Sequence, residues 1–244
     1  MRYATYTKFE LLRTLRNRRF FFLALLFPLV MYYLIAAPQR HNTDLIGTGL
    51  SAPLYYMVGM GEFATMSAVI SAGVRIAAER QVGWNRQLRL TPLSTRGYFR
   101  AKVLTAYLTA GLALLLLYVA GTTLGVRLAA HDWMTMTGYI LIGLVPFVAL
   151  GILLGHLLTA DSISPAVGGA TALFAIMGGA WFPVGSGTFG DIAKFLPSYW
   201  LVQASHVALG GGGWPARGWI TVGVWAVVLA ALAGRAYQRD TRRV

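Results

Sequence analysis

The hydrophobic positions of this chain gather into six long segments that are separated by polar pieces. The segments cover residues 20–37, 55–78, 103–126, 138–158, 166–183 and 219–236. Each is close to the roughly 20 mostly apolar residues that a helix needs to cross a bilayer. The second is the least apolar because it contains Glu62, Ser67, Ser71 and Arg75. The pattern predicts an all-α protein with six transmembrane helices in a single domain, residues 1–244.

The first polar piece, residues 3–19, has the spacing of an amphipathic helix. Three leucines share one side and three polar residues the other: Leu11, Leu12 and Leu15 against Glu10, Arg13 and Asn17. A basic helix that leads into a span is typical of a segment lying in the membrane interface, its arginines facing anionic headgroups. The alternative is an ordinary positively charged flank.

The piece between the last two spans, residues 184–218, is long and not very polar. Phe189, Ile192 and Leu196 recur at helical spacing before Pro197, and the apolar stretch 199–209 ends at a glycine run. Glycine and proline are common helix stops. We expect short helices here, embedded at the outer interface, where aromatic residues such as Tyr199, Trp200 and Trp214 prefer to lie.

Composition supports the membrane assignment. The chain is 57% hydrophobic and 12% charged, whereas a soluble domain carries about 25% charged residues. The net charge of +13 does not indicate nucleic acid, because the basic residues cluster at the ends of the apolar segments. The chain has no cysteine, which excludes disulfides and thiolate metal sites.

The distribution of basic residues predicts the orientation. If the N-terminus is cytoplasmic, the inner pieces 1–19, 79–102, 159–165 and 235–244 hold 16 of the 21 basic residues, and the outer pieces hold four. Lysine and arginine favour the cytoplasmic side. Both termini should therefore lie in the cytoplasm of a multi-pass protein of the bacterial inner (plasma) membrane.

Motifs for catalysis or nucleotide binding are absent from the sequence. No P-loop sequence occurs, the four histidines are far apart, and no G-x-S-x-G is present. We expect no catalytic residue and no metal site. Two G-x-x-x-G pairs, at Gly121/Gly125 and Gly151/Gly155, allow close helix approach within or between subunits.

Residues 79–102 interrupt two long apolar runs with arginines, a tryptophan and a Thr-Pro turn. The stretch predicts a short helix over 79–90, a turn at Thr91-Pro92 and a new helix capped by Ser94. A basic inner loop would explain the arginines, but not Trp84 and Leu88 on one face in an aqueous loop. Exposed apolar side chains beside charge are typical of a surface that docks a partner protein.

This stretch resembles the first cytoplasmic loop of ABC transporter permeases of the type-2 export family, as in bacterial drug and antibiotic exporters. The matching residues, in order, are Glu79, Gly83, Leu88, Thr91, Pro92 and Lys102. A second resemblance lies at the end of the fifth span and before the sixth, at Phe182, Pro183, Leu196, Pro197 and Tyr199. The resemblance covers essentially the whole chain.

The resemblance implies a half-transporter. Two such membrane subunits, identical or paralogous, would assemble with two separate ATPase subunits, which bind ATP and Mg while this chain binds no cofactor. The 79–90 segment would act as the coupling helix that docks on the ATPase. The coupling residues implied are Glu79, Gly83, Trp84, Arg86, Leu88, Arg89, Thr91 and Pro92.

The expected cargo is a hydrophobic or amphipathic compound, such as a drug, an antibiotic or a lipid-like molecule, and its efflux would confer antibiotic resistance. Candidates for the substrate path are Glu62, Trp181 and Phe182. The alternative within the family is export of a polysaccharide or lipid-linked glycan. From other classes, a membrane-embedded enzyme or an anchoring subunit remain alternatives, and an ATPase that co-purifies would discriminate them.

Glu62 allows three interpretations. It could line the substrate path and favour cationic amphiphiles, since an intramembrane carboxylate usually faces a cavity or a partner. It could pair with His156, because Arg75 lies 13 residues, about 20 Å, away along the helix. Alternatively, the second span begins later than residue 55 and leaves Glu62 at the outer interface.

Overall fold

The computed structural model describes residues 2–17, 22–83, 94–185, 187–204, 206 and 212–242. Predicted coupling residues Trp84, Arg86, Leu88, Arg89, Thr91 and Pro92 lie outside this part of the chain. Within it the protein is all helical, with no β-strand. The all-α prediction is confirmed for these residues.

Four helical stretches are long and apolar enough to cross a membrane: Ala52–Gln81, Arg96–Thr123, Ala130–Leu157 and Ala216–Arg239. They are formed by α4 (Ala52–Gln81), α6 (Thr95–Thr123), α7 (Ala130–Gly143) with α8 (Val145–Leu157), and α12 (Ala216–Arg242). Two shorter apolar stretches, Ala24–Ala36 and Ile163–Gly178, fall in the first and fifth predicted spans. All six apolar segments are therefore helical, while the count of six membrane crossings stays a prediction.

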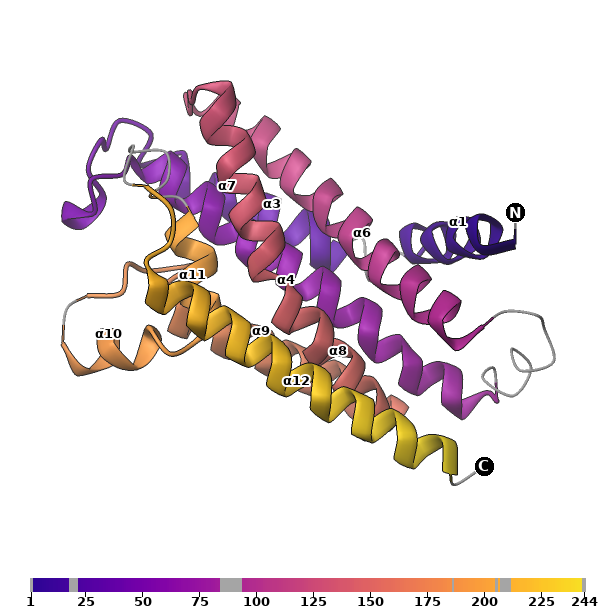
Figure 1. Cartoon of the computed structure of the whole chain (residues 1–244). Coiled ribbons are helices and arrows are strands. Elements are labelled where there is room, and N and C mark those ends of the chain that lie inside the picture. The colour runs from indigo at the N-terminus through magenta and orange to yellow at the C-terminus, as the bar shows by residue number, and fades with distance from the viewer. Residues whose placement is uncertain are drawn as a thin grey trace.

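The remaining helices are short or lie at the ends of the bundle. They are α1 (Arg2–Leu15), the π-helical η1 (Phe22–Leu26), α3 (Phe27–Ala36), the 3₁₀ turns η2 (Leu45–Gly47) and η3 (Ala160–Ser162), α9 (Ile163–Gly178), α10 (Thr188–Ala193) and α11 (Pro197–Gln203). Helices α10 and α11 confirm that the piece after the fifth span forms short helices. Both termini lie at one end of the bundle, which we call the terminal end; the end of α4 and the start of α6 lie there too (Figure 1).

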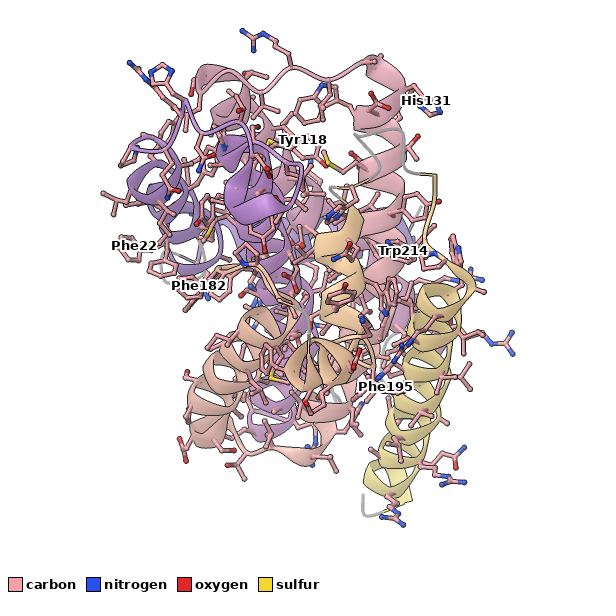
Figure 2. The ribbon with its side chains drawn as sticks, turned by 90° about the vertical axis from the view of Figure 1, so that its left-hand side faces the viewer. Phe22, Tyr118, His131, Phe182, Phe195 and Trp214 are labelled. Carbon is pink, nitrogen blue, oxygen red and sulfur yellow. The ribbon has the colours of Figure 1, made fainter. Side chains whose placement is uncertain are left out.

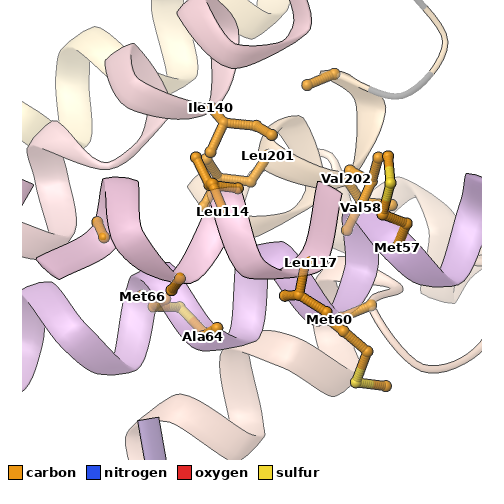
Figure 3. Close-up of a cluster of buried hydrophobic side chains, with 14 of the residues drawn as sticks. Met57, Val58, Met60, Ala64, Met66, Leu114, Leu117, Ile140, Leu201 and Val202 are labelled. Atoms are coloured by element: carbon orange, nitrogen blue, oxygen red, sulfur yellow. The ribbon is translucent and has the colours of Figure 1, made fainter. Parts of the chain in front are cut away.

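Helix α4 is the centre of the fold. It packs against α3, α6, α8 and α9. Figure 3 shows Met57, Met60 and Met66 of α4 in the same buried cluster as Leu114 and Leu117 of α6, with Met60 beside Leu117. The three methionines are buried. Between membrane helices such contacts stabilise mainly through close van der Waals packing. The least apolar predicted span is therefore the helix most enclosed by protein, and its small and polar residues face other helices.

Glycines let α4 and α8 approach until their backbones touch. A Cβ added at Gly73 would lie 2.2 Å from the carbonyl carbon of Gly151, and one added at Gly155 would lie 2.5 Å from the Gly73 oxygen. Such approach is typical of small residues in membrane helices. The Gly151/Gly155 pair thus makes a contact within the chain, and Gly121 packs on Met57.

Two sequence signals set the ends of the helices beside the undescribed segment 84–93. Gly83, with φ of +69°, follows the last turn of α4, and its N–H donates to the Arg80 carbonyl at 3.1 Å. The predicted start of a separate coupling helix at Glu79 is therefore wrong, because residues 79–81 are the last turn of α4. Ser94 caps α6 by accepting from the Gly97 N–H at 3.2 Å, as predicted.

The aromatic residues of the opposite end are more enclosed than expected. Trp200 of α11 and Trp214 are buried and pack with Tyr139 of α7, and the Trp200 indole N–H donates to the Lys194 carbonyl at 3.0 Å. Helix α11 lies against α7, α9 and α12, and its predicted place at the outer interface stays a prediction. The exposed aromatic residues include Phe182 and Phe195, which are labelled with Trp214 in Figure 2.

Candidate functional site

A buried group of charges joins α1, α4 and α6 at the terminal end. The Lys102 ammonium of α6 donates to the Glu10 carboxylate of α1 and to the Glu79 carboxylate of α4, each at 2.5 Å. All three side chains are at most 5% exposed. The Lys102 ammonium therefore joins α6 to the preceding helix α4 and to α1, which is far away in sequence.

Glu79 has further partners around the same site. Its second oxygen accepts from the Tyr98 hydroxyl at 2.6 Å, and the exposed Arg13 approaches its first oxygen at 3.4 Å. The Lys102 ammonium also lies 5.4 Å from the centre of the Tyr98 ring. We call Glu10, Arg13, Glu79, Tyr98 and Lys102 the Lys102 cluster.

Two arginines of α4 extend these contacts to either side of the Lys102 cluster. Arg75 donates to the hydroxyl of Thr14 in α1, and the Thr14 hydroxyl donates to the Glu10 carbonyl at 2.8 Å. Arg80 donates to the carbonyls of His156 and Gly155, at 2.9 and 3.4 Å, near the end of α8. The terminal end of α4 is thus bonded to α1, α6 and α8 together.

Each buried charged side chain of the Lys102 cluster depends on its partners. Desolvating charges costs several kcal/mol per ion, and only good geometry with further hydrogen bonds offsets that cost. Here each carboxylate has a close cation, and Glu79 also accepts from a phenol. If one helix moves, the other two lose a partner. The arrangement can therefore transmit a displacement among α1, α4 and α6.

Helix α1 packs on the bundle through its polar side, and not through the side that carries Leu12. Glu10 and Thr14 are buried against the bundle, whereas Phe9 and Leu12 are exposed. The polar side of α1 thus provides its contacts with α4 and α6. The exposed apolar side is the one available to lipid if α1 lies in the membrane interface, which stays a prediction.

The predicted coupling residues fall into two groups. Glu79 lies in the Lys102 cluster and Gly83 ends α4; the other six lie outside the described residues. The sequence did not identify Glu10, Arg13 and Tyr98 as partners of Glu79 and Lys102. The signals that could have found them were the single acidic residue of the basic piece 3–19 and one of only three lysines in the chain.

The predicted substrate-path residues lie in different surroundings. Glu62 is fully buried, ten residues into α4, and neither carboxylate oxygen has a hydrogen-bond partner among the described residues. The ring of Trp181 lies 5.8 Å from that of Phe63, and Phe182 is 70% exposed. Of the three residues, Glu62 is enclosed, Trp181 is partly buried and Phe182 is exposed.

One of the three interpretations of Glu62 is contradicted. Pairing with His156 is wrong, because neither Glu62 carboxylate oxygen has a hydrogen-bond partner among the described residues, and the His156 carbonyl binds Arg80 at the terminal end of α4. Helix α4 begins at Ala52, which does not place Glu62 relative to a membrane. A place in the substrate path and a place at the outer interface both stay predictions.

Comparison with known proteins points to one functional class. No family model matches the chain. The sequence is 28% identical over 211 residues, 83% of this chain and 83% of the relative, to a protein of Bacillus subtilis (strain 168) named "Putative transport permease YvfS". The shared length includes most of the apolar helices of this chain. Over most of its length the chain is therefore similar to a protein that is named as a transport permease.

Proposed function

We propose that this chain is the membrane subunit of an ATP-driven exporter that moves hydrophobic or amphipathic compounds out of a bacterial cell. Two ATPase subunits would bind ATP and Mg, and a second copy of this chain or a paralogous permease would complete the membrane part. The similarity to a transport permease supports the class. The observation that carries the mechanism is the Lys102 cluster, which lies where the chain leaves α4 and re-enters α6.

The Lys102 cluster would pass a movement of residues 84–93 on to α4, α6 and α1. A partner that docks on residues 84–93 would pull or push on the end of α4 at Gln81 and the start of α6 at Thr95. Because Glu79 and Lys102 are bonded to each other and to Glu10, the two spans and α1 would move together. The backbone contacts of α4 with α8 would carry the movement into the rest of the bundle.

Docking of the ATPase is tested by removing two apolar side chains of the segment 84–93, those of Trp84 and Leu88. Loss of a desolvated tryptophan at an interface costs about 2 kcal/mol or more. We therefore expect Trp84→Ala with Leu88→Ala to reduce the amount of ATPase that co-purifies with the chain, and to lower transport, while the thermal unfolding of the membrane subunit is unchanged.

The matched control for this docking test is Trp219→Ala, a 44% exposed tryptophan at the opposite end of the bundle. It should leave ATPase recovery as in the unmodified complex. If the double variant and the control retain the same amount of ATPase, residues 84–93 are only a charged flank.

The orientation is tested with single cysteines, since the chain contains none. Val82 at the terminal end and Thr188 in α10 at the other end are both exposed. In intact cells a membrane-impermeant thiol reagent should label Thr188→Cys and spare Val82→Cys until the cells are permeabilised. Labelling of Val82→Cys alone in intact cells would reverse the proposed topology.

A further inference from the structure

Glu62 is a buried acid with no partner in the part of the chain that the structure describes. Its exposure is 0%, and both carboxylate oxygens lack a hydrogen bond. Burying a carboxylate in protein without a hydrogen-bond partner is costly. The described part of the fold therefore gives no stabilising reason for an acid here.

The surroundings of Glu62 form a junction between α4, the end of α9 and α11. Residues 55, 59 and 62 share one face of α4 because they are spaced by four and three positions. On that face the Tyr55 hydroxyl donates to the Gly179 carbonyl, and Gly59 touches the backbone of Ala180. Glu62 thus points toward the chain that follows α9.

Other polar atoms in this junction also lack hydrogen bonds among the described residues. They are the Trp181 indole nitrogen and the Ser198 hydroxyl, and Ser198 lies against Gly178 at the end of α9. Buried polar atoms are paired in the great majority of cases. Several unpaired ones along one junction indicate a site whose ligand supplies the missing interactions.

At Gly59, α4 contacts the chain after α9 without interlocking side chains. A Cβ at Gly59 would lie 2.0 Å from the Ala180 oxygen, so the contact is between backbones. Aromatic rings lead from it to the surface: Trp181 lies 5.8 Å from Phe63, and the neighbouring Phe182 is 70% exposed. An apolar molecule that entered beside Phe182 would contact the rings of Trp181 and Phe63 before it reached the Glu62 carboxylate.

We propose that Glu62 selects lipophilic cations, with its carboxylate binding the positive charge and Trp181 and Phe63 holding the apolar body. Aromatic faces also attract cations directly. The closed junction seen here would then be the arrangement without cargo. This inference rests on the proposed export function only for the opening of the junction; the binding of a cation at Glu62 can be measured without transport.

Tetraphenylphosphonium and tetraphenylborate have the same shape and opposite charge, so together they isolate the effect of charge. The purified complex in lipid nanodiscs should bind the phosphonium more tightly than the borate, after subtraction of empty nanodiscs. Glu62→Gln should weaken phosphonium binding at least about tenfold, because one partner of a desolvated charge pair is lost, and leave borate binding unchanged. Glu62→Asp should retain the preference. Thr109→Ala, a buried change in α6 outside the junction, should leave the binding of both ions unchanged.

Equal binding of the two ions, or an equal loss of both in Glu62→Gln, would overturn the proposal. A measurement on the unmodified protein covers the case in which Glu62→Gln does not fold. Dicyclohexylcarbodiimide, an apolar reagent for carboxyl groups, should modify Glu62, and tetraphenylphosphonium but not tetraphenylborate should protect it, as read by peptide mass spectrometry. Absence of protection would contradict cation binding there. Binding with no ATP-driven movement would count against the export function alone.

Discussion

Replacing Lys102 with methionine is expected to release α1 from the bundle. The ammonium is the shared partner of Glu10 and Glu79, both buried, so the variant leaves two carboxylates facing each other without a cation between them. Breaking a buried pair from one side costs about 3–5 kcal/mol. Hydrogen exchange of the amides of residues 2–15 should speed up strongly, and ATP hydrolysis by the complex should continue with little transport.

The exposed arginine of the same cluster provides the control. Arg13 approaches Glu79 at 3.4 Å but is 57% exposed, and such pairs contribute about 1 kcal/mol or less. Arg13→Gln should therefore leave the exchange of α1 almost unchanged. Converting both acids as well, in Glu10→Gln/Glu79→Gln/Lys102→Met, should recover much of the loss, since the buried charges are gone. Equal exchange in Lys102→Met and Arg13→Gln would show that the cluster does not hold α1.

The second large effect is expected at the backbone contact between α4 and α8. In Gly73→Ala the new methyl group would lie 2.2 Å from the Gly151 carbonyl carbon and 2.5 Å from the Ile152 nitrogen. Overpacking typically costs 1–3 kcal/mol and sometimes more, and backbone atoms cannot rotate away. We expect destabilisation of about 3 kcal/mol, seen as a clearly lower unfolding temperature in detergent by circular dichroism.

Gly111→Ala is the matched control for the α4–α8 contact. Gly111 lies in α6 with no atom within 4 Å of the added Cβ, and alanine favours a helix over glycine by about 0.8–1 kcal/mol. This variant should unfold at the same temperature as the unmodified chain or slightly higher. If both glycine variants unfold alike, α4 and α8 are not as close as the structure describes.

Hydrophobic patterning predicts the helices of this protein well because apolar length is a local property. Every predicted span corresponds to a helix, but helices extend into polar residues: α4 continues to Gln81 and α6 begins at Thr95. Hydropathy marks only the apolar part of a helix, whereas hydrogen bonding and caps such as Ser94 decide where it ends. Hydropathy also underestimates α4: its polar residues are there because the helix is surrounded by other helices.

The candidate site could not be predicted because its contacts are not local. Lys102 and Glu10 are 92 positions apart, and Lys102 and Glu79 are 23 apart. Nothing in their spacing says which acid meets which base, since the pairing depends on how α1 docks across α4 and α6. The resemblance to a permease family singled out Glu79 and Lys102 as motif positions, and the structure adds that they bind each other.

The two G-x-x-x-G pairs have different roles in the structure, although their sequence pattern is the same. The G-x-x-x-G pair at Gly151 predicts close approach of a helix, and the structure identifies α4 as that helix, through Gly73. The same pattern at Gly121/Gly125 is used differently: Gly121 packs on a methionine, and Gly125 takes a φ of +92° just after α6. The motif indicates a small residue at a tight place, but not which partner requires it.

The export function is tested most directly by ATP-dependent uptake into inverted membrane vesicles that contain the chain and its ATPase. In such vesicles, export from the cell appears as uptake, and a panel of hydrophobic and amphipathic compounds including tetraphenylphosphonium can be followed. The account predicts uptake of at least one compound that requires ATP and is lost when the ATPase cannot hydrolyse it. Uptake that is the same with active and hydrolysis-deficient ATPase would contradict it.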